Sequence, residues 1–253
     1  MERLMMPKRY KLIGCEILFR EICLCAAYSS NVIDIECMAK GLHDIGEEGM
    51  SKTLQETIDR VDCKNYEAIL LCYGLCNYGV KGLRHEKLPI VIPRAHDCIT
   101  LFLGSKEKYL DYFNKNPGTY FRTSGWIERA SFGIEGENNV MSQLGIQLGS
   151  DYQQYLEEYG EENAEYLMEM LGNWTKNYKK QTFIDTKVGN PSAYEAISEA
   201  DAKNMGFEHE SLQGDISLIQ DLMDGNWNKE DFLVIPPGHK IIATHDDSIM
   251  AYE

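Results

Sequence analysis

Short apolar runs alternate with amphipathic stretches along the first half of the chain. Four runs have the length and composition of strands buried in a sheet, at residues 10–13, 31–36, 68–71 and 89–92. Three stretches place apolar side chains at helical spacing, at residues 17–27, 51–61 and 106–114. A further short strand is expected at residues 119–123. The rhythm predicts an α/β fold with a mostly parallel, doubly wound sheet and helices on both of its faces.

The alternation of predicted strands and helices is interrupted once and then resumes, which predicts three consecutive parts of the chain. Residues 1–134 form the first α/β half, and residues 135–180 are expected to be a helical insertion rich in Glu and Tyr. Residues 181–253 return to the α/β pattern and close the same domain. The elements expected there are strands at residues 182–184 and 231–235 and helices at residues 191–205 and 216–223.

Composition limits which partners and which cellular compartment we expect for the protein. The formal net charge of −15 disfavours nucleic acid, because binding to phosphates depends on clustered Lys and Arg. No apolar run is long enough to cross a bilayer, and the start lacks the apolar core of a signal peptide, so we expect no membrane partner and a cytoplasmic location. In that compartment the eight cysteines are expected to be reduced thiols.

Chemically active side chains follow three of the expected strands, directly after each strand ends. The segments are Gly14-Cys15-Glu16, Cys72-Tyr73-Gly74-Leu75-Cys76 and Arg94-Ala95-His96-Asp97-Cys98. In an open α/β sheet, ligands bind at the carboxyl ends of the strands, where the loops leave a crevice. The sequence therefore predicts a metal or thiolate site at this edge of the sheet.

Cys76, His96 and Cys98 are the first candidates for metal ligands, with Cys15 or Cys72 as a fourth. Thiolate and imidazole ligands of this kind are typical of Zn²⁺, and iron or an iron–sulfur cluster is the alternative. A buried cysteine is also a common core residue, and that interpretation fits Cys72 alone better than ligation does.

Three polar side chains beside these ligands are candidates for catalysis. Asp97 or Glu16 could move a proton, and Arg94 could hold an anionic group. If Cys76, His96 and Cys98 alone bind the metal, a fourth position stays open for a small-molecule substrate, anionic or thiol in character. Four protein ligands would instead close the site and make it structural.

Several of these segments resemble an uncharacterised family of anaerobic bacteria and methanogenic archaea whose domain has no known function. The resemblance covers most of residues 10–130, and the Arg-Ala-His-Asp-Cys run is its most specific part. Its motifs are Tyr73-Gly74-Leu75-Cys76-Asn77, Ile92-Pro93-Arg94-Ala95-His96-Asp97-Cys98, Gly104-Ser105 and Pro117-Gly118-Thr119-Tyr120. Members are often found beside corrinoid-dependent methyltransferase systems, so the resemblance implies a context of one-carbon metabolism in an anaerobe.

Three hypotheses for function follow. The first is a cytoplasmic zinc-dependent protein, an enzyme if its site is open, that acts in methyl or other one-carbon group transfer. The second is a non-catalytic accessory protein that carries a metal, a corrinoid or a small ligand for a partner methyltransferase. The third is a structural zinc or iron–sulfur site in a scaffold whose pocket lies elsewhere.

Overall fold

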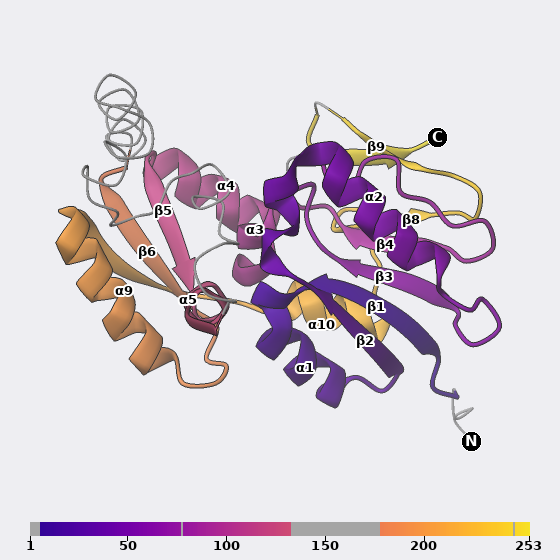
Figure 1. Ribbon diagram of the computed structural model, residues 1–253, viewed down its shortest axis with the longest axis horizontal. Coiled ribbons are helices and arrows are strands. Elements are labelled where there is room, and N and C mark those ends of the chain that lie inside the picture. Colours follow the sequence, from indigo (N-terminus) through magenta and orange to yellow (C-terminus); the bar gives the residue numbers. More distant parts are fainter. Residues whose placement is uncertain (1–5, 77, 133–177, 245) are drawn as a thin grey trace, which may run out of the picture.

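A five-stranded sheet forms the centre of the protein. The computed structural model describes residues 6–76, 78–132, 178–244 and 246–253. The strands lie in the order β2-β1-β3-β4-β8, and all neighbours are parallel except β4 and β8. They comprise β1 (Arg9–Cys15), β2 (Val32–Met38), β3 (Ala68–Cys72), β4 (Ile90–Pro93) and β8 (Phe232–Ile235). The prediction of an α/β fold with a mostly parallel sheet is confirmed (Figure 1).

Helices cover both faces of this sheet because the side chains of the central strands alternate between two cores. On one face Tyr10, Leu12 and Leu70 pack with α1 (Phe19–Tyr28), α3 (Cys98–Leu103) and α10 (Ser217–Asp224). On the other face Ile13 and Ile69 pack with α2 (Gly46–Asp59). Strands buried on both faces read as continuous apolar runs, which is why the sequence reveals them.

One helix begins earlier than the sequence predicts, and another was not predicted. The helix expected over residues 51–61 begins five residues earlier, at Gly46, after the 3₁₀ helix η2 (Lys40–Ile45). Ser51 lies inside α2, where its hydroxyl donates to the carbonyl of Lys81 at 3.0 Å. The helix α3, with only six residues, is too short to show a periodic pattern.

A second, three-stranded parallel sheet lies beside the first. Its order is β5-β6-β7, made of β5 (Thr119–Thr123), β6 (Lys180–Asp185) and β7 (Glu208–Gln213). Its helices are α4 (Lys106–Lys115), α5 (Ser124–Phe132) and α9 (Pro191–Met205), and Figure 1 shows this unit to the left of the central sheet. The sequence prediction missed β7, because His209, Glu210 and Ser211 interrupt any apolar alternation along it.

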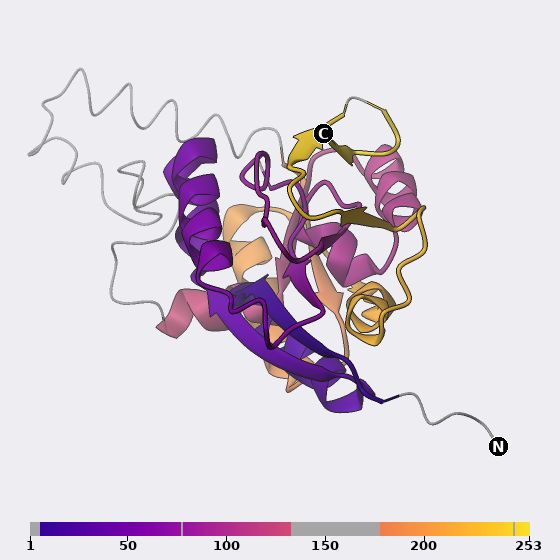
Figure 2. The same ribbon diagram turned by 90° about the vertical axis from the view of Figure 1, so that its right-hand side faces the viewer.

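A short C-terminal hairpin of β9 (Ile241–Ala243) and β10 (Met250–Tyr252) completes the fold. It packs beside β8, as Figure 2 shows in yellow. The helical insertion expected at residues 135–180 falls almost entirely on 133–177, outside the described residues. Among the described helices, none combines the length and apolar character that crossing a membrane requires.

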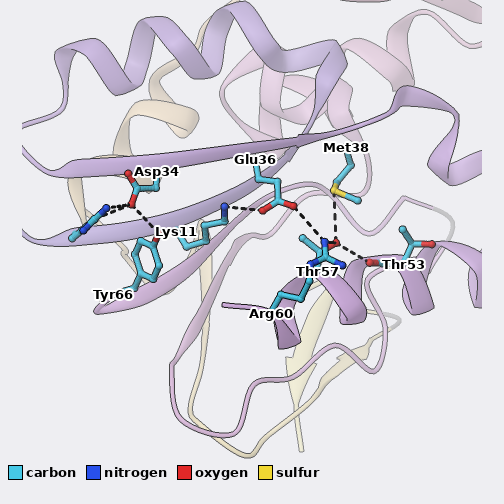
Figure 3. A network of polar contacts seen from close by, with 9 residues as sticks. Lys11, Asp34, Glu36, Met38, Thr53, Thr57, Arg60 and Tyr66 are labelled. Carbon is cyan, nitrogen blue, oxygen red and sulfur yellow. Dashed lines mark hydrogen bonds and ion pairs between the residues drawn. The ribbon is translucent and has the colours of Figure 1, made fainter. Parts of the chain in front are cut away.

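The exposed edge strand β2 is lined by ion pairs. Asp34 accepts from the Arg9 guanidinium and, at 2.8 Å, from the Tyr66 hydroxyl. Glu36 pairs with Lys11 at 2.7 Å on the neighbouring strand (Figure 3). Charged side chains on an edge strand discourage pairing with another chain, so this network protects the outer edge of the sheet.

Hydrogen bonds join the two sheets to each other. The Asp215 amide, which follows β7, donates to the carbonyl of Phe102 in α3 at 2.8 Å. The Thr186 hydroxyl, which follows β6, donates to the carboxyl group of Glu21 in α1 at 2.7 Å. Glu21 is only 2% exposed, and burial raises the pKa of its carboxyl group although the Thr186 hydrogen bond opposes the shift.

We expect Glu21→Gln to stabilise the protein at neutral and alkaline pH. The native state keeps the Glu21 proton to a higher pH than the unfolded chain, whose carboxyl titrates near 4.5. The stability that Glu21 contributes is therefore present below that pH and is lost as pH rises through the folded pKa. Glutamine keeps an acceptor for Thr186 without the buried charge.

Thermal unfolding from about pH 4 to about pH 8 measures this effect. The Tm of Glu21→Gln should exceed that of the wild type at the upper end and match it at the lower end. Glu199→Gln, on the exposed face of α9, is the matched control and should change neither. A Glu21→Gln protein less stable than the wild type at every pH would show that the carboxylate itself is needed.

Candidate functional site

The order of the central strands creates a switch point between β1 and β3. The chain passes from β1 through α1 to β2 on one side, then through α2 to β3 on the other side of β1. The helices on either side of such a point lie on opposite faces, so the loops at the carboxyl ends of the two strands diverge. Cys15 ends β1, and Cys72 ends β3. The predicted site residues therefore lie where α/β sheets bind ligands.

Backbone contacts bring the loop after β3 against the loop after β4. The amide of Leu75 donates to the carbonyl of Ala95 at 2.8 Å, and the amide of Cys76 donates to the carbonyl of His96 at 3.0 Å. Gly74 makes this approach possible, because a Cβ atom there would lie 2.7 Å from the Cα atom of Asp97. Cys76 itself adopts a left-handed φ of 44°, which turns the chain sharply beside Asp97.

Three thiols come together at these strand ends. Cys15, Cys76 and Cys98 are each partly buried, and each is a thiol. Burial raises the pKa of Cys76 to about 12, and the neighbouring Cys15 contributes to the rise. Burial also raises the pKa of Cys98 well above its usual value, with Asp97, Cys76 and Cys15 as further causes. The three sulfurs are thus close enough for the charge of one to affect the others.

Asp97 joins this thiol cluster, defined as Cys15, Cys76 and Cys98, to the start of α3. Its Oδ1 atom accepts from the amide of Ile99 at 3.0 Å, so Asp97 is the N-cap of the helix. Its Oδ2 atom accepts from the Tyr109 hydroxyl of α4 at 3.1 Å. Burial raises the pKa of Asp97, although both hydrogen bonds oppose the shift. A carboxyl group with a raised pKa beside thiols is suited to proton transfer.

The remaining predicted residues occupy different surroundings. The His96 side chain is exposed, and the carbonyl oxygen of His96 accepts from the amide of Cys76. Cys72 is fully buried in the apolar core. Glu16 accepts from the amide of Lys40 at 2.8 Å and lies 3.8 Å from the Arg129 guanidinium. Within the described ranges, no three His, Cys, Asp or Glu side chains already surround one point closely enough to hold a metal ion.

Arg94 is held by the C-terminal part of the chain. Its Nε atom donates to the carbonyl of Lys229 at 3.0 Å, and its Nη1 atom donates to the carbonyls of Ser248 and Met250. Arg94 therefore anchors the segment that leads into β10, and its role as an anion-binding residue stays a prediction.

The carboxyl end of β5 also approaches this region. Helix α5 follows β5 directly, and a Cβ atom at Gly125 would lie 1.7 Å from the carbonyl oxygen of Ile17 in the 3₁₀ helix η1 (Glu16–Leu18). The Lys40 ammonium group lies 5.7 Å from the centre of the Trp126 ring. Elements of both parallel sheets thus meet beside Cys15 and Glu16.

The sequence analysis did not single out two tyrosines of the site. Tyr73 directly follows β3, is 3% exposed, and experiences the charges of Cys15 and Cys76. Tyr73 lies within a segment that the sequence already marked, so its place after a buried strand was the available clue. Tyr109 contacts Asp97 from another element, and no local pattern could reveal that contact.

We expect Gly74→Ala to destabilise the protein by roughly 1–3 kcal/mol, because the methyl group would overlap the backbone of Asp97. Chemical denaturation measures the change. Gly49→Ala is the matched control, since its nearest neighbour is the flexible side chain of Ile45, and it should be neutral or stabilising within α2. Equal stability of Gly74→Ala and the wild type would contradict the tight packing of the two loops.

Comparisons with known proteins place the chain in a family. Neither the curated proteins nor the solved structures include a match to it. A family model does match residues 37–223, which contain Tyr73, Cys76, Asp97 and Cys98 and begin after Cys15. This match spans well over half of the sequence, and the chain belongs to the family described as "Protein of unknown function (DUF1638)".

Proposed function

We propose that this protein binds a thiophilic metal ion, with zinc as the first candidate, through Cys15, Cys76 and Cys98. The proposal depends on one observation: three partly buried thiols follow three adjacent strands at the carboxyl edge of the sheet, around its switch point. Zn²⁺ favours sulfur ligands, and iron is the alternative metal. Loading requires the cysteine side chains to rotate toward one point, because the described side chains do not surround a metal position beforehand.

A packing role explains the thiol cluster less well than it explains the other cysteines. Cys25 and Cys72 are fully buried among apolar side chains, where a thiol acts as a small apolar group. Cys76 and Cys98 also pack against the apolar cores, but they are only partly buried and stand in a left-handed turn and at the first position of a helix, beside the carboxyl group of Asp97. A divalent cation is the partner that would let three neighbouring thiolates coexist.

Three sulfur ligands leave one position of a tetrahedral zinc site for substrate or water. A zinc ion there would hold a substrate thiol as thiolate or polarise a bound group, and this chemistry suits the transfer of a methyl or other one-carbon group. Asp97, with its raised pKa, would move the proton, and Glu16 is the second candidate for that role. His96 would have to turn inward to become a fourth ligand.

The family resemblance extends this proposal to a partner protein. The resemblance described from the sequence implies corrinoid-dependent methyltransferase systems, so the methyl donor or acceptor would be held by such a partner in the cytoplasm of an anaerobe. The same residues could instead store or deliver the metal for that partner. Zinc binding with an open fourth position favours transfer, and zinc closed by protein ligands alone favours storage or a structural role.

We expect anaerobically purified protein to contain about one zinc or iron ion per chain. The double variant Cys76→Ser/Cys98→Ser should lose the metal, because it removes two of the three sulfur ligands. Elemental analysis of the purified proteins measures both values.

Cys63→Ser is the matched control. Cys63 is also partly buried, but it precedes β3 and therefore lies at the opposite edge of the sheet from the thiol cluster. Its removal should leave the metal content unchanged. A folded, metal-free wild type that takes up neither zinc nor iron when supplied with them would refute the proposal.

A further prediction concerns the open position. Cobalt-substituted protein should change its visible spectrum when a small thiol such as 2-mercaptoethanol is added, because the thiol would become the fourth ligand. Asp97→Asn keeps a side chain able to cap α3 but cannot exchange the carboxyl proton. It should therefore bind cobalt normally, but the proton lost by the thiol on binding would pass to the buffer and not to residue 97. Buffer-dependent calorimetry should show more protons released to the buffer by the variant than by the wild type. A spectrum that no added thiol changes would indicate a closed, structural site.

A further inference from the structure

The hydroxyl group of Tyr73 is buried without a hydrogen-bond partner. Tyr73 is the first residue after β3, at the switch point, and only 3% of it is exposed. Within the described part of the chain, its hydroxyl oxygen is inaccessible and makes no hydrogen bond. A buried hydroxyl without a partner costs free energy that a phenyl ring of the same shape would not. This cost suggests that an acceptor reaches the hydroxyl in another state of the protein.

The neighbours of Tyr73 identify that acceptor. Strands β1 and β3 are parallel with Gly14 opposite Cys72, so Cys15 and Tyr73 are the next residues along the two strands. Cys15 and Cys76 pack against the same apolar core that contains Tyr73. A tyrosine hydroxyl carries its proton at neutral pH, so Tyr73 is a hydrogen-bond donor. A neutral thiol is a weak acceptor, whereas a thiolate accepts a strong, charge-assisted hydrogen bond.

We propose that Tyr73 is a positioning residue of the thiol cluster, whose hydroxyl donates a hydrogen bond to the Cys15 sulfur when that sulfur is bound to a metal as thiolate. This inference rests on the proposed metal binding. Groups that donate to metal-bound ligands fix the orientation of those ligands and strengthen metal binding. Tyr73 packs in the same core as Cys15 and Cys76, so the hydrogen bond would hold the sulfur from β1 toward the loop after β3.

Tyr73→Phe tests the proposal because it removes only the hydroxyl. Zinc affinity, measured by competition with a chelator, should fall about 10–100-fold. The sulfur-to-metal charge-transfer band of the cobalt-substituted protein should shift, because the sulfur loses a hydrogen bond. The metal-free variant should be as stable as the metal-free wild type, or more stable, because an unpartnered hydroxyl has been removed.

Tyr66→Phe is the matched control. The Tyr66 hydroxyl donates to Asp34 at 2.8 Å (Figure 3). Tyr66 precedes β3, whereas Tyr73 follows it, so the two hydroxyls belong to opposite ends of that strand. Its removal should lower the stability of the metal-free protein and leave zinc affinity and the cobalt spectrum unchanged.

The outcomes separate this inference from the proposed function. A wild type that binds no zinc, cobalt or iron overturns the proposed function, and the inference falls with it. A wild type that binds zinc, with Tyr73→Phe binding it equally tightly, overturns the inference alone. A Tyr73→Phe protein that is unfolded, or less stable without metal, also contradicts the inference, because the hydroxyl would then have a structural partner.

Discussion

The pairing of two loops is the constraint on which the candidate site depends. Two backbone hydrogen bonds hold residues 75 and 76 against residues 95 and 96. Gly74 permits that contact because its missing Cβ leaves room for the backbone of Asp97. Without this pairing, Cys76 and Cys98 would belong to separate loops. With it, the two thiols share one edge of the sheet, and the switch point brings Cys15 to the same edge.

Contacts from the second sheet reinforce this arrangement. The Tyr109 hydroxyl of α4 binds Asp97, and the amide of Asp215, after β7, binds the carbonyl of Phe102 in α3. Helix α3, which starts at Cys98, is thus held at both ends by elements next to the second sheet, namely α4 and the loop after β7. The central sheet supplies the thiols, and the second sheet fixes the helix that carries one of them.

The sequence revealed the elements that are buried on both faces and concealed those that are not. Strands β1, β3 and β4 are continuous apolar runs, so their ends, and the reactive residues after them, could be located. Strand β7 alternates charged and polar residues at the protein surface and gave no comparable pattern. The sequence pattern predicts a helix from Ser51, a residue suited to capping, whereas α2 begins at Gly46 without a side-chain cap.

The features of the candidate site also divide into those that the sequence reveals and those that it conceals. Strand order predicts that Cys15, Cys76 and Cys98 follow strand ends at one edge of the sheet, because parallel strands present their carboxyl ends there. The pairing of residues 75 and 76 with residues 95 and 96 depends on the path of the loops, which strand order does not give. The exposure of His96 and the engagement of Arg94 by backbone carbonyls depend on the path of the loops and of the C-terminal segment. The buried hydroxyl of Tyr73 depends on packing, which a linear pattern does not encode.

X-ray absorption at the metal edge of zinc-loaded protein tests the central claim most directly, because it counts the sulfur atoms bound to the metal. The thiol cluster predicts three sulfur ligands at about 2.3 Å in the wild type. It predicts two in Cys15→Ser and three in Cys63→Ser. A zinc shell of nitrogen and oxygen atoms only, or a sulfur count unchanged in Cys15→Ser, would contradict the account.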